Sequence, residues 1–129
     1  MKNSTINSKT IKELTDFLPI IYDDKIEVAK GPKKGEADLF GGYHIYHPSI
    51  EKFFELASQQ YWQDYQYVEN FSYQMIEQGE IEKASINQLK TILTWCNRVE
   101  RFNEGHWEYV IKDDVIKRVL NRLIQINEN

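Results

Sequence analysis

Apolar side chains recur at helical spacing most clearly in two segments of this chain. Residues 48–61 carry one apolar stripe, and Pro48 at their start suits the first position of a helix. Residues 86–102 carry a second stripe, which follows a potential capping residue, Ser85, and ends shortly before Gly105. Both segments are predicted to be helices, the second one central. Their apolar positions are Ile50, Phe53, Phe54, Ala57 and Tyr61, then Leu89, Ile92, Leu93, Cys96 and Val99.

Weaker patterns predict helices before and between these two. Residues 10–22 have helical periodicity, and Thr10 with Glu13 fits a capping box. Pro19 interrupts the pattern, so a kink or two short helices are expected there. A third helix is predicted from about residue 65, with Gly79 able to end it in a left-handed conformation.

The C-terminal part predicts a short turn or helix over residues 106–112, then a last helix. Asp113 or Asp114 can cap that helix. Its apolar positions are Val115, Ile116, Val119, Leu120, Leu123 and Ile126.

Residues 23–47 form the least regular part of the sequence. Glycine and proline punctuate them, and only residues 25–30 and 43–47 look extended, so we expect at most two short strands. The fold class is therefore all-α or mainly α, a compact bundle of four to six helices in one domain over residues 1–129. The ends, before about Lys9 and after about Ile126, are expected to fray.

Composition narrows the class of protein. A chain of 129 residues with 41% hydrophobic residues suits one independently folding domain. There is no apolar run of about 18 residues and no signal-like start, so we expect neither a membrane span nor secretion. Cys96 is the only cysteine, which excludes an intramolecular disulfide and favours a cytoplasmic location. The net charge of -4 argues against binding duplex nucleic acid through a basic face.

No complete catalytic or metal-binding pattern is present in the sequence. The glycines at positions 31 and 35 lack the spacing of a phosphate loop. His44, His47 and His106 do not form a known ligand pattern, and a strand would place the first two on opposite faces. Cys96 lies on an apolar stripe, where a thiol acts as a small hydrophobe. We therefore expect no metal and no cofactor.

Residues 95–107 contain the densest cluster of chemically versatile side chains. On a regular helix Glu100 falls inside the apolar sector, whereas Arg98 and Arg101 point away from it. An unpaired buried carboxylate is costly, so we expect Glu100 to be largely buried and ion-paired. Arg122 and Arg101 are the expected partners.

The same stretch carries an Arg-x-Glu-Arg-Phe-x-x-Gly pattern, formed by Arg98, Glu100, Arg101, Phe102 and Gly105. In this it resembles a family of uncharacterised bacterial proteins, a domain of unknown function with that signature late in the chain. The resemblance extends upstream to the aromatic segment 43–48 and covers about residues 40–126, although His47 stands where a small capping residue is expected. It implies a fold and a candidate site but no activity.

Three functional interpretations follow. The leading one is a non-catalytic module that binds a protein or a small anionic ligand. The second is a small enzyme with Glu100 or His106 as acid/base and Arg98 or Arg101 holding an anionic substrate. The third is an acidic antagonist or mimic that inhibits a nucleic-acid-binding defence protein. The candidate ligand- or partner-binding residues are Tyr43, Tyr46, Arg98, Glu100, Arg101, His106 and Trp107.

Overall fold

Helices dominate the fold, which confirms the prediction of a mainly helical chain. The computed structural model describes residues 6–30 and 45–128. Two residues in each of two segments pair as an antiparallel ladder, Ala29 opposite Tyr46 and Lys30 opposite Ile45. The elements are α1 (Ser8–Thr15), α2 (Leu18–Ile21), β1 (Ala29–Lys30), β2 (Ile45–Tyr46), α3 (Pro48–Ala57), α4 (Tyr67–Asn70), α5 (Ile86–Arg98), α6 (His106–Lys112) and α7 (Val115–Glu128).

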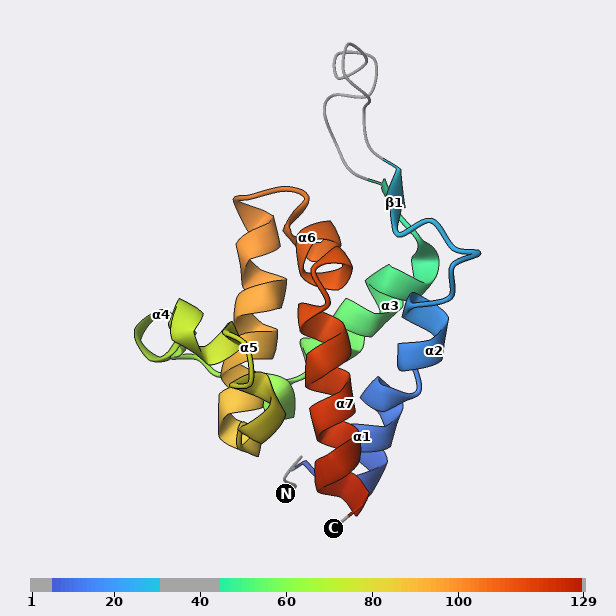
Figure 1. The fold of residues 1–129 in the computed structure, drawn as a ribbon. Coiled ribbons are helices and arrows are strands. Elements are labelled where there is room, and N and C mark those ends of the chain that lie inside the picture. The colour runs from blue at the N-terminus through green and yellow to red at the C-terminus, as the bar shows by residue number, and fades with distance from the viewer. Residues whose placement is uncertain (1–5, 31–44, 129) are drawn as a thin grey trace.

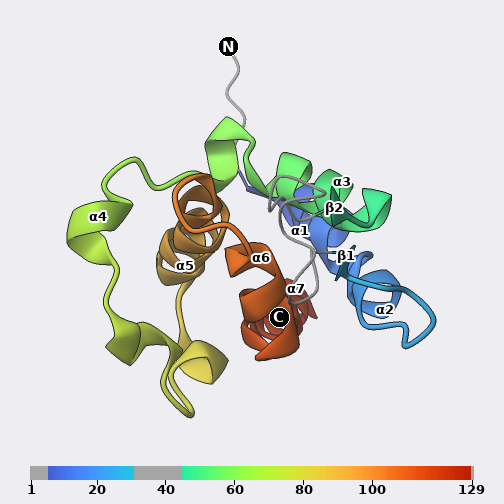
Figure 2. The ribbon, with the colours of Figure 1, turned by 90° about the horizontal axis from the view of Figure 1, so that it is seen from above.

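The helices α5, α6 and α7 form the middle of the molecule. In Figures 1 and 2, α1–α3 lie on one side of these three helices, and the segment that contains α4 lies on the other. The last helix, α7, packs along α1, and α5 contacts α3, α4, α6 and α7. The prediction that residues 86–102 hold the central helix is therefore confirmed for α5. No helix among residues 6–30 and 45–128 is long and apolar enough to cross a bilayer.

Side chains that satisfy backbone groups set where the helices begin. Ser85 accepts from the backbone N–H of Gln88 at 3.2 Å and completes the expected start of α5. His47 caps α3 through Nδ1, which accepts from the N–H of Ser49 at 3.1 Å, so an imidazole does what a smaller residue was expected to do. The α1 cap differs from the prediction, because Asn7 is the N-cap and Thr10 is its partner within the helix.

The core is built around α5. The side chains of Leu89, Ile92, Leu93 and Cys96 are fully buried there, together with Phe53 of α3. Burial raises the pKa of the Cys96 thiol, so the neutral form is favoured and the residue acts as a packed hydrophobe, as the sequence indicated.

The side chain of Tyr22 hydrogen-bonds the N-terminal helices to the C-terminal part of the chain. Residues 10–22 form two short helices around Pro19, as predicted, and Tyr22 caps the second. Its hydroxyl donates to the carbonyl oxygen of Ile111 at 2.8 Å and accepts from the N–H of Lys117 at 2.9 Å. It therefore holds α2 against the turn between α6 and α7, where Asp114 has a left-handed φ of 64°.

The prediction of a third helix over residues 65–79 is wrong. Only α4 and a turn of 3-10 helix at Tyr73–Ile76 form, and the chain is extended at Phe71. Tyr65 and Val68 are 68% and 75% exposed, so a continuous helix here would have no apolar stripe to bury. Phe71 instead stacks on Trp95 of α5, with ring centroids 4.3 Å apart.

Hydrogen bonds fix this irregular segment at both ends. Asp64 accepts from the Thr91 hydroxyl at 2.6 Å and from Asn70 Nδ2 at 3.0 Å. At the other end, Arg118 of α7 donates to Glu82 and to the carbonyl oxygens of residues 76 and 77. Burial by itself raises the pKa of the Asp64 carboxyl, but donation from Thr91, Asn70 and the Gln66 backbone outweighs it and holds that pKa below its usual range.

The bond between Asp64 and Thr91 leads to a stability prediction. Thr91→Val keeps the shape but removes the donor, so at pH 7 we expect the free energy of unfolding to fall by about 1–2 kcal/mol. A carboxyl with a lowered folded-state pKa stabilises the fold above its unfolded pKa, and this contribution is lost as pH falls through the folded value. The deficit of the variant should therefore shrink below about pH 4.

Urea unfolding at several pH values measures this effect. Thr15→Val is the control, because the Thr15 hydroxyl makes only a 3.4 Å bond within α1 and should show little change. A Thr91→Val protein as stable as the parent, or a deficit that does not change with pH, would contradict the assignment.

Candidate functional site

A hollow of about 560 Å³ lies between α3 and the C-terminal end of α5. The end of α5, the following 3-10 turn Val99–Arg101 and the start of α6 supply one part of its lining, and α3 supplies another. We call it the α3–α5 hollow. Its lining residues are Glu51, Phe54, Glu55, Ser58, Gln63, Tyr65, Asn97, Arg98, Glu100, Arg101 and Trp107.

Aromatic stacking gives this hollow a fixed framework. The rings of Phe54 and Trp107 are 4.4 Å apart and almost parallel, at 7°. Tyr46 of β2 packs on Trp107 with centroids 4.9 Å apart. Asn97 donates to the carbonyl oxygen of Phe54 at 3.2 Å, so α5 and α3 are also joined by a hydrogen bond. The Phe54 stack thus joins α3 to α6, and the Asn97 hydrogen bond joins α3 to α5.

Glu100 is a structural acceptor at the edge of the hollow. Its oxygens accept from the Tyr46 hydroxyl at 3.0 Å, from the Gly105 N–H at 3.2 Å and from the Trp107 N–H at 2.8 Å. Donors at the start of α6 thus meet a carboxylate, which the helix dipole also favours. Burial and the neighbouring Glu100 carboxylate raise the pKa of the Tyr46 hydroxyl, which therefore stays a donor.

The prediction that an arginine pairs with Glu100 is wrong. Arg122 instead donates to the carbonyl oxygen of Ala84 at 2.9 Å and to Gln125 at 3.2 Å. Glu100 is only partly buried, and neutral donors satisfy it. The helical-wheel argument assumed that α5 continues through residue 102, whereas the chain tightens into the 3-10 turn at Val99.

Arg98 and Arg101 line the hollow with their charges uncompensated. Within the described part of the chain, neither has a carboxylate oxygen within the 4.0 Å of an ion pair. Arg98 is half-buried and makes one long bond, 3.5 Å from Nη2 to Gln63 Oε1, while Arg101 is exposed. Both guanidinium groups are therefore available to an incoming anionic group.

His106 lies apart from these residues. Its side chain is 6% exposed and meets the Trp95 ring edge to face, with centroids 4.5 Å apart. It is not among the described residues that line the hollow, and its Nε2 is buried with no hydrogen-bond partner in the described structure. Burial lowers the pKa of His106, with Glu100 acting weakly in the opposite direction, so the neutral form is favoured.

The structure brings together most of the predicted site. Arg98, Glu100, Arg101 and Trp107 line one hollow, and Tyr46 contacts it through Glu100 and Trp107. Tyr43 lies outside the described residues. Sequence reasoning missed the α3 contribution, Glu51 and Glu55, although two carboxylates four residues apart share one helix face and flank the predicted apolar stripe.

No group of three or more His, Cys, Asp or Glu side chains among residues 6–30 and 45–128 is arranged to hold a metal ion. His44 lies outside those ranges.

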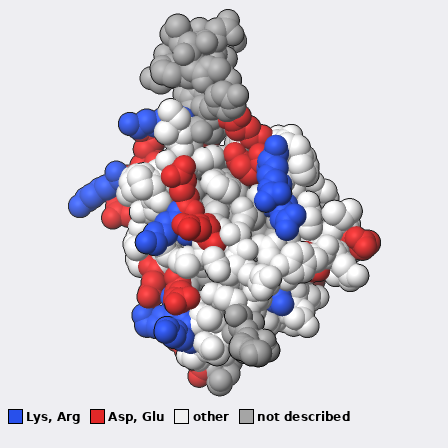
Figure 3. Space-filling model, turned by 180° about the vertical axis from the view of Figure 1, so that it is seen from behind, with Lys and Arg blue, Asp and Glu red and all other residues white. Residues whose placement is uncertain are grey.

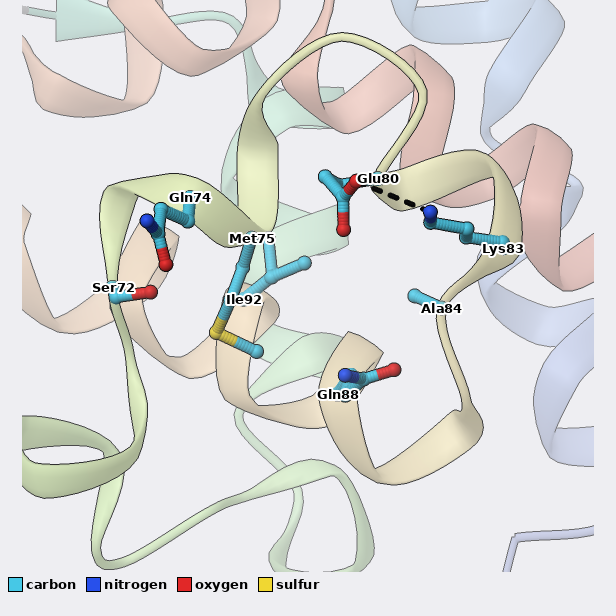
Figure 4. A pocket seen from close by; sticks show the side chains of 8 residues that line it. All are labelled: Ser72, Gln74, Met75, Glu80, Lys83, Ala84, Gln88 and Ile92. Atoms are coloured by element: carbon cyan, nitrogen blue, oxygen red, sulfur yellow. Dashed lines mark ion pairs between the residues drawn. The ribbon is translucent and has the colours of Figure 1, made fainter.

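A separate hollow of about 310 Å³ lies between the first half of α5 and the segment of residues 72–84. Figure 4 shows Met75 and Ile92 together on one side of it and Glu80 and Lys83 near its rim. Glu80 and Lys83 form an ion pair of 3.3 Å. The charges of this hollow thus compensate each other, unlike those of the α3–α5 hollow.

The sequence profile of a family of unknown function, DUF6508, matches residues 6–129. The chain belongs to the DUF6508 family. The match confirms the expected membership in a family of unknown function and extends further than the predicted range of residues 40–126. The signature of Arg98 to Gly105 stays a prediction for DUF6508. No curated protein and no solved structure matches the chain significantly.

Replacing Glu100 should weaken the junction between β2, α5 and α6. In Glu100→Gln an amide group faces three donors, so we expect the free energy of unfolding to fall by roughly 1–3 kcal/mol. Tyr46→Phe should cost about 1 kcal/mol, and the double variant should lose less than the sum, because both changes remove one shared bond.

Urea unfolding of these variants is compared with that of Glu77→Gln, which changes an exposed carboxylate away from the hollow. That control should stay within about 0.5 kcal/mol of the parent. Strict additivity of the Tyr46 and Glu100 changes would show that the hydrogen bond contributes nothing to stability.

Buried His106 should make stability depend on pH below neutrality. Its folded-state pKa lies below the unfolded value of about 6.5, so the unfolded chain binds the proton more readily. The free energy of unfolding should therefore fall as pH drops from 7.5 to 5. His106→Phe keeps the aromatic contact without titrating and should reduce that slope, as measured by urea unfolding across this range. Equal slopes would reject a buried neutral His106.

Proposed function

We propose that this DUF6508 chain is a non-catalytic binding module whose α3–α5 hollow holds the carboxylate or phosphate group of a ligand or partner protein. One observation carries the proposal: Arg98 and Arg101 line the same hollow, and neither has a carboxylate partner among the described residues. Planar guanidinium groups with several donors suit carboxylate and phosphate oxygens better than other protein cations do.

The state of the two predicted acid–base residues favours binding over catalysis. Both oxygens of Glu100 accept hydrogen bonds from Tyr46 and from backbone N–H groups. His106 is buried against Trp95 and is not a described lining residue of the hollow. A general acid or base needs hydrogen-bond reach to its substrate. His106 does not line the described hollow, and Glu100, although it lines it, already has both oxygens engaged by donors.

The distribution of charge supports a discrete site in preference to a nucleic-acid surface. On the face seen in Figure 3, acidic and basic side chains are interspersed without a continuous positive stripe. Duplex binding relies on many simultaneous phosphate contacts by basic residues. The buried thiol of Cys96 supports the further proposal of a reducing, cytoplasmic setting.

Titration with acetate and with inorganic phosphate at constant ionic strength tests this function. Backbone and indole N–H signals are followed by NMR, and we expect saturable shifts at Trp107 and around Arg98. Arg98→Ala should weaken the interaction about tenfold, since one charge-assisted contact is lost.

The matched control is Lys9→Ala, which removes one exposed positive charge from α1. It should bind as the parent does. Shifts that never saturate, or that are the same in the Arg98→Ala and Lys9→Ala proteins, would overturn the anion site.

A further inference from the structure

The α3–α5 hollow carries charges of both signs, supplied by different elements. Glu51 and Glu55 come from α3, four residues apart on one helix face, while Arg98 and Arg101 come from the end of α5 and the 3-10 turn. Among the described residues, none of these four side chains has an oppositely charged group within 4.0 Å. The two arginines and the two α3 carboxylates therefore line one space without pairing with each other.

Glu100 adds a third carboxylate to this lining, but its oxygens are already engaged. Although it lines the same hollow, its oxygens accept from Tyr46, Gly105 and Trp107, so its charge is already stabilised by three donors. The carboxylates that remain without a described partner are those of α3.

In the hollow of Figure 4, by contrast, an acidic and a basic side chain lie close enough to form an ion pair. Glu80 and Lys83 are three residues apart on one stretch of chain and form a 3.3 Å ion pair. In the α3–α5 hollow the two signs lie on separate helices. The hydrogen bond from Asn97 to Phe54 ties α5 to α3, and the stack of Phe54 on Trp107 ties α3 to α6. The framework therefore keeps the charges from closing on each other.

We propose that the hollow recognises a small zwitterion, a free α-amino acid or a short peptide. Its carboxylate is held by Arg98 and Arg101, and its ammonium group is held by Glu51 and Glu55. The half-buried Trp107, backed by the buried ring of Phe54, offers an apolar surface to its side chain. A volume of about 560 Å³ lies within the usual range for small-molecule sites. The arginine half of this inference rests on the proposed function, and the acidic half goes beyond it.

Isothermal titration with four probes tests the requirement for both charges. L-phenylalanine and the dipeptide glycyl-L-phenylalanine carry both, N-acetyl-L-phenylalanine carries only the carboxylate, and L-phenylalanine amide carries only the ammonium group. We expect at least one zwitterion to bind about tenfold more tightly than either single-charge probe, because each adds a charge-assisted contact. Tighter binding of L-phenylalanine would indicate a site for a free amino acid, and tighter binding of the dipeptide would indicate a site for a short peptide.

The remaining outcomes separate the two proposals. If N-acetyl-L-phenylalanine binds as tightly as the zwitterions, the anion site stands and the zwitterion inference is overturned. If no probe shows saturable binding, or only the amide does, both are overturned.

Substitutions test which side of the hollow binds each charge of the ligand. Glu55→Gln should weaken the preferred zwitterion about fivefold or more while leaving N-acetyl-L-phenylalanine unchanged or improved, since only the zwitterion needs the acid. Arg98→Ala should weaken both probes. Glu77→Gln, with the same change of charge at an exposed position outside the hollow, should alter neither.

Glu55 is exposed on α3, so its substitution is not expected to unfold the protein, and circular dichroism checks this. Unaltered zwitterion binding in the double variant Glu51→Gln, Glu55→Gln would overturn the inference.

Discussion

The burial of residues 91–96 of α5 on every side is the constraint on which the rest of this fold depends. A helix at the surface buries one stripe, but in α5 all of residues 91–96 are buried, including Thr91 and Thr94. Such a helix needs neighbours around its whole circumference, and α3, α4, α6 and α7 provide them. Its buried hydroxyls need partners too. Thr94 accepts from the Asp64 N–H and Thr91 donates to the Asp64 carboxylate, so the irregular segment beside α5 is fixed by the helix it covers.

The candidate site lies where α5 leaves this core. From Asn97 onward the side chains are partly exposed, and the sequence changes from apolar to charged. The chain must then reverse direction within a few residues to start α6, and a reversal exposes backbone N–H groups at the new helix start. Glu100 meets two of them and also binds the Tyr46 hydroxyl of β2. With Glu100 engaged in this way, neither Arg98 nor Arg101 has a carboxylate within ion-pair distance among the described residues.

Sequence periodicity predicted the elements whose stability comes from a long apolar stripe. The starts of α3 and α5 and the apolar stripe of α7 agree with it, because Pro48, Ser85 and the apolar spacing act locally. The helix prediction failed for the segment after Tyr65. There Phe71 stacks on Trp95 of α5, and the apolar residues do not form a stripe of their own. The cluster of Arg98 to Trp107 was found, but Glu51 and Glu55 were not. Their place opposite the arginines depends on the packing of α3 against α5, which no local pattern encodes.

In the proposed zwitterion site, the same packing makes recognition depend on two charges at once. Arg101 is exposed and Arg98 half-buried, so each competes with water for any anion, which limits the free energy that one contact contributes. One carboxylate alone therefore gains little selectivity over chloride or buffer anions. A ligand that also meets the α3 carboxylates adds a second contact without a second loss of translational freedom. Because the hydrogen bond from Asn97 to Phe54 ties α5 to α3, only a molecule with both charges at a matching separation obtains both contacts. The selectivity of the site would thus come from distance between charges, a property set by the fold and not by any one residue.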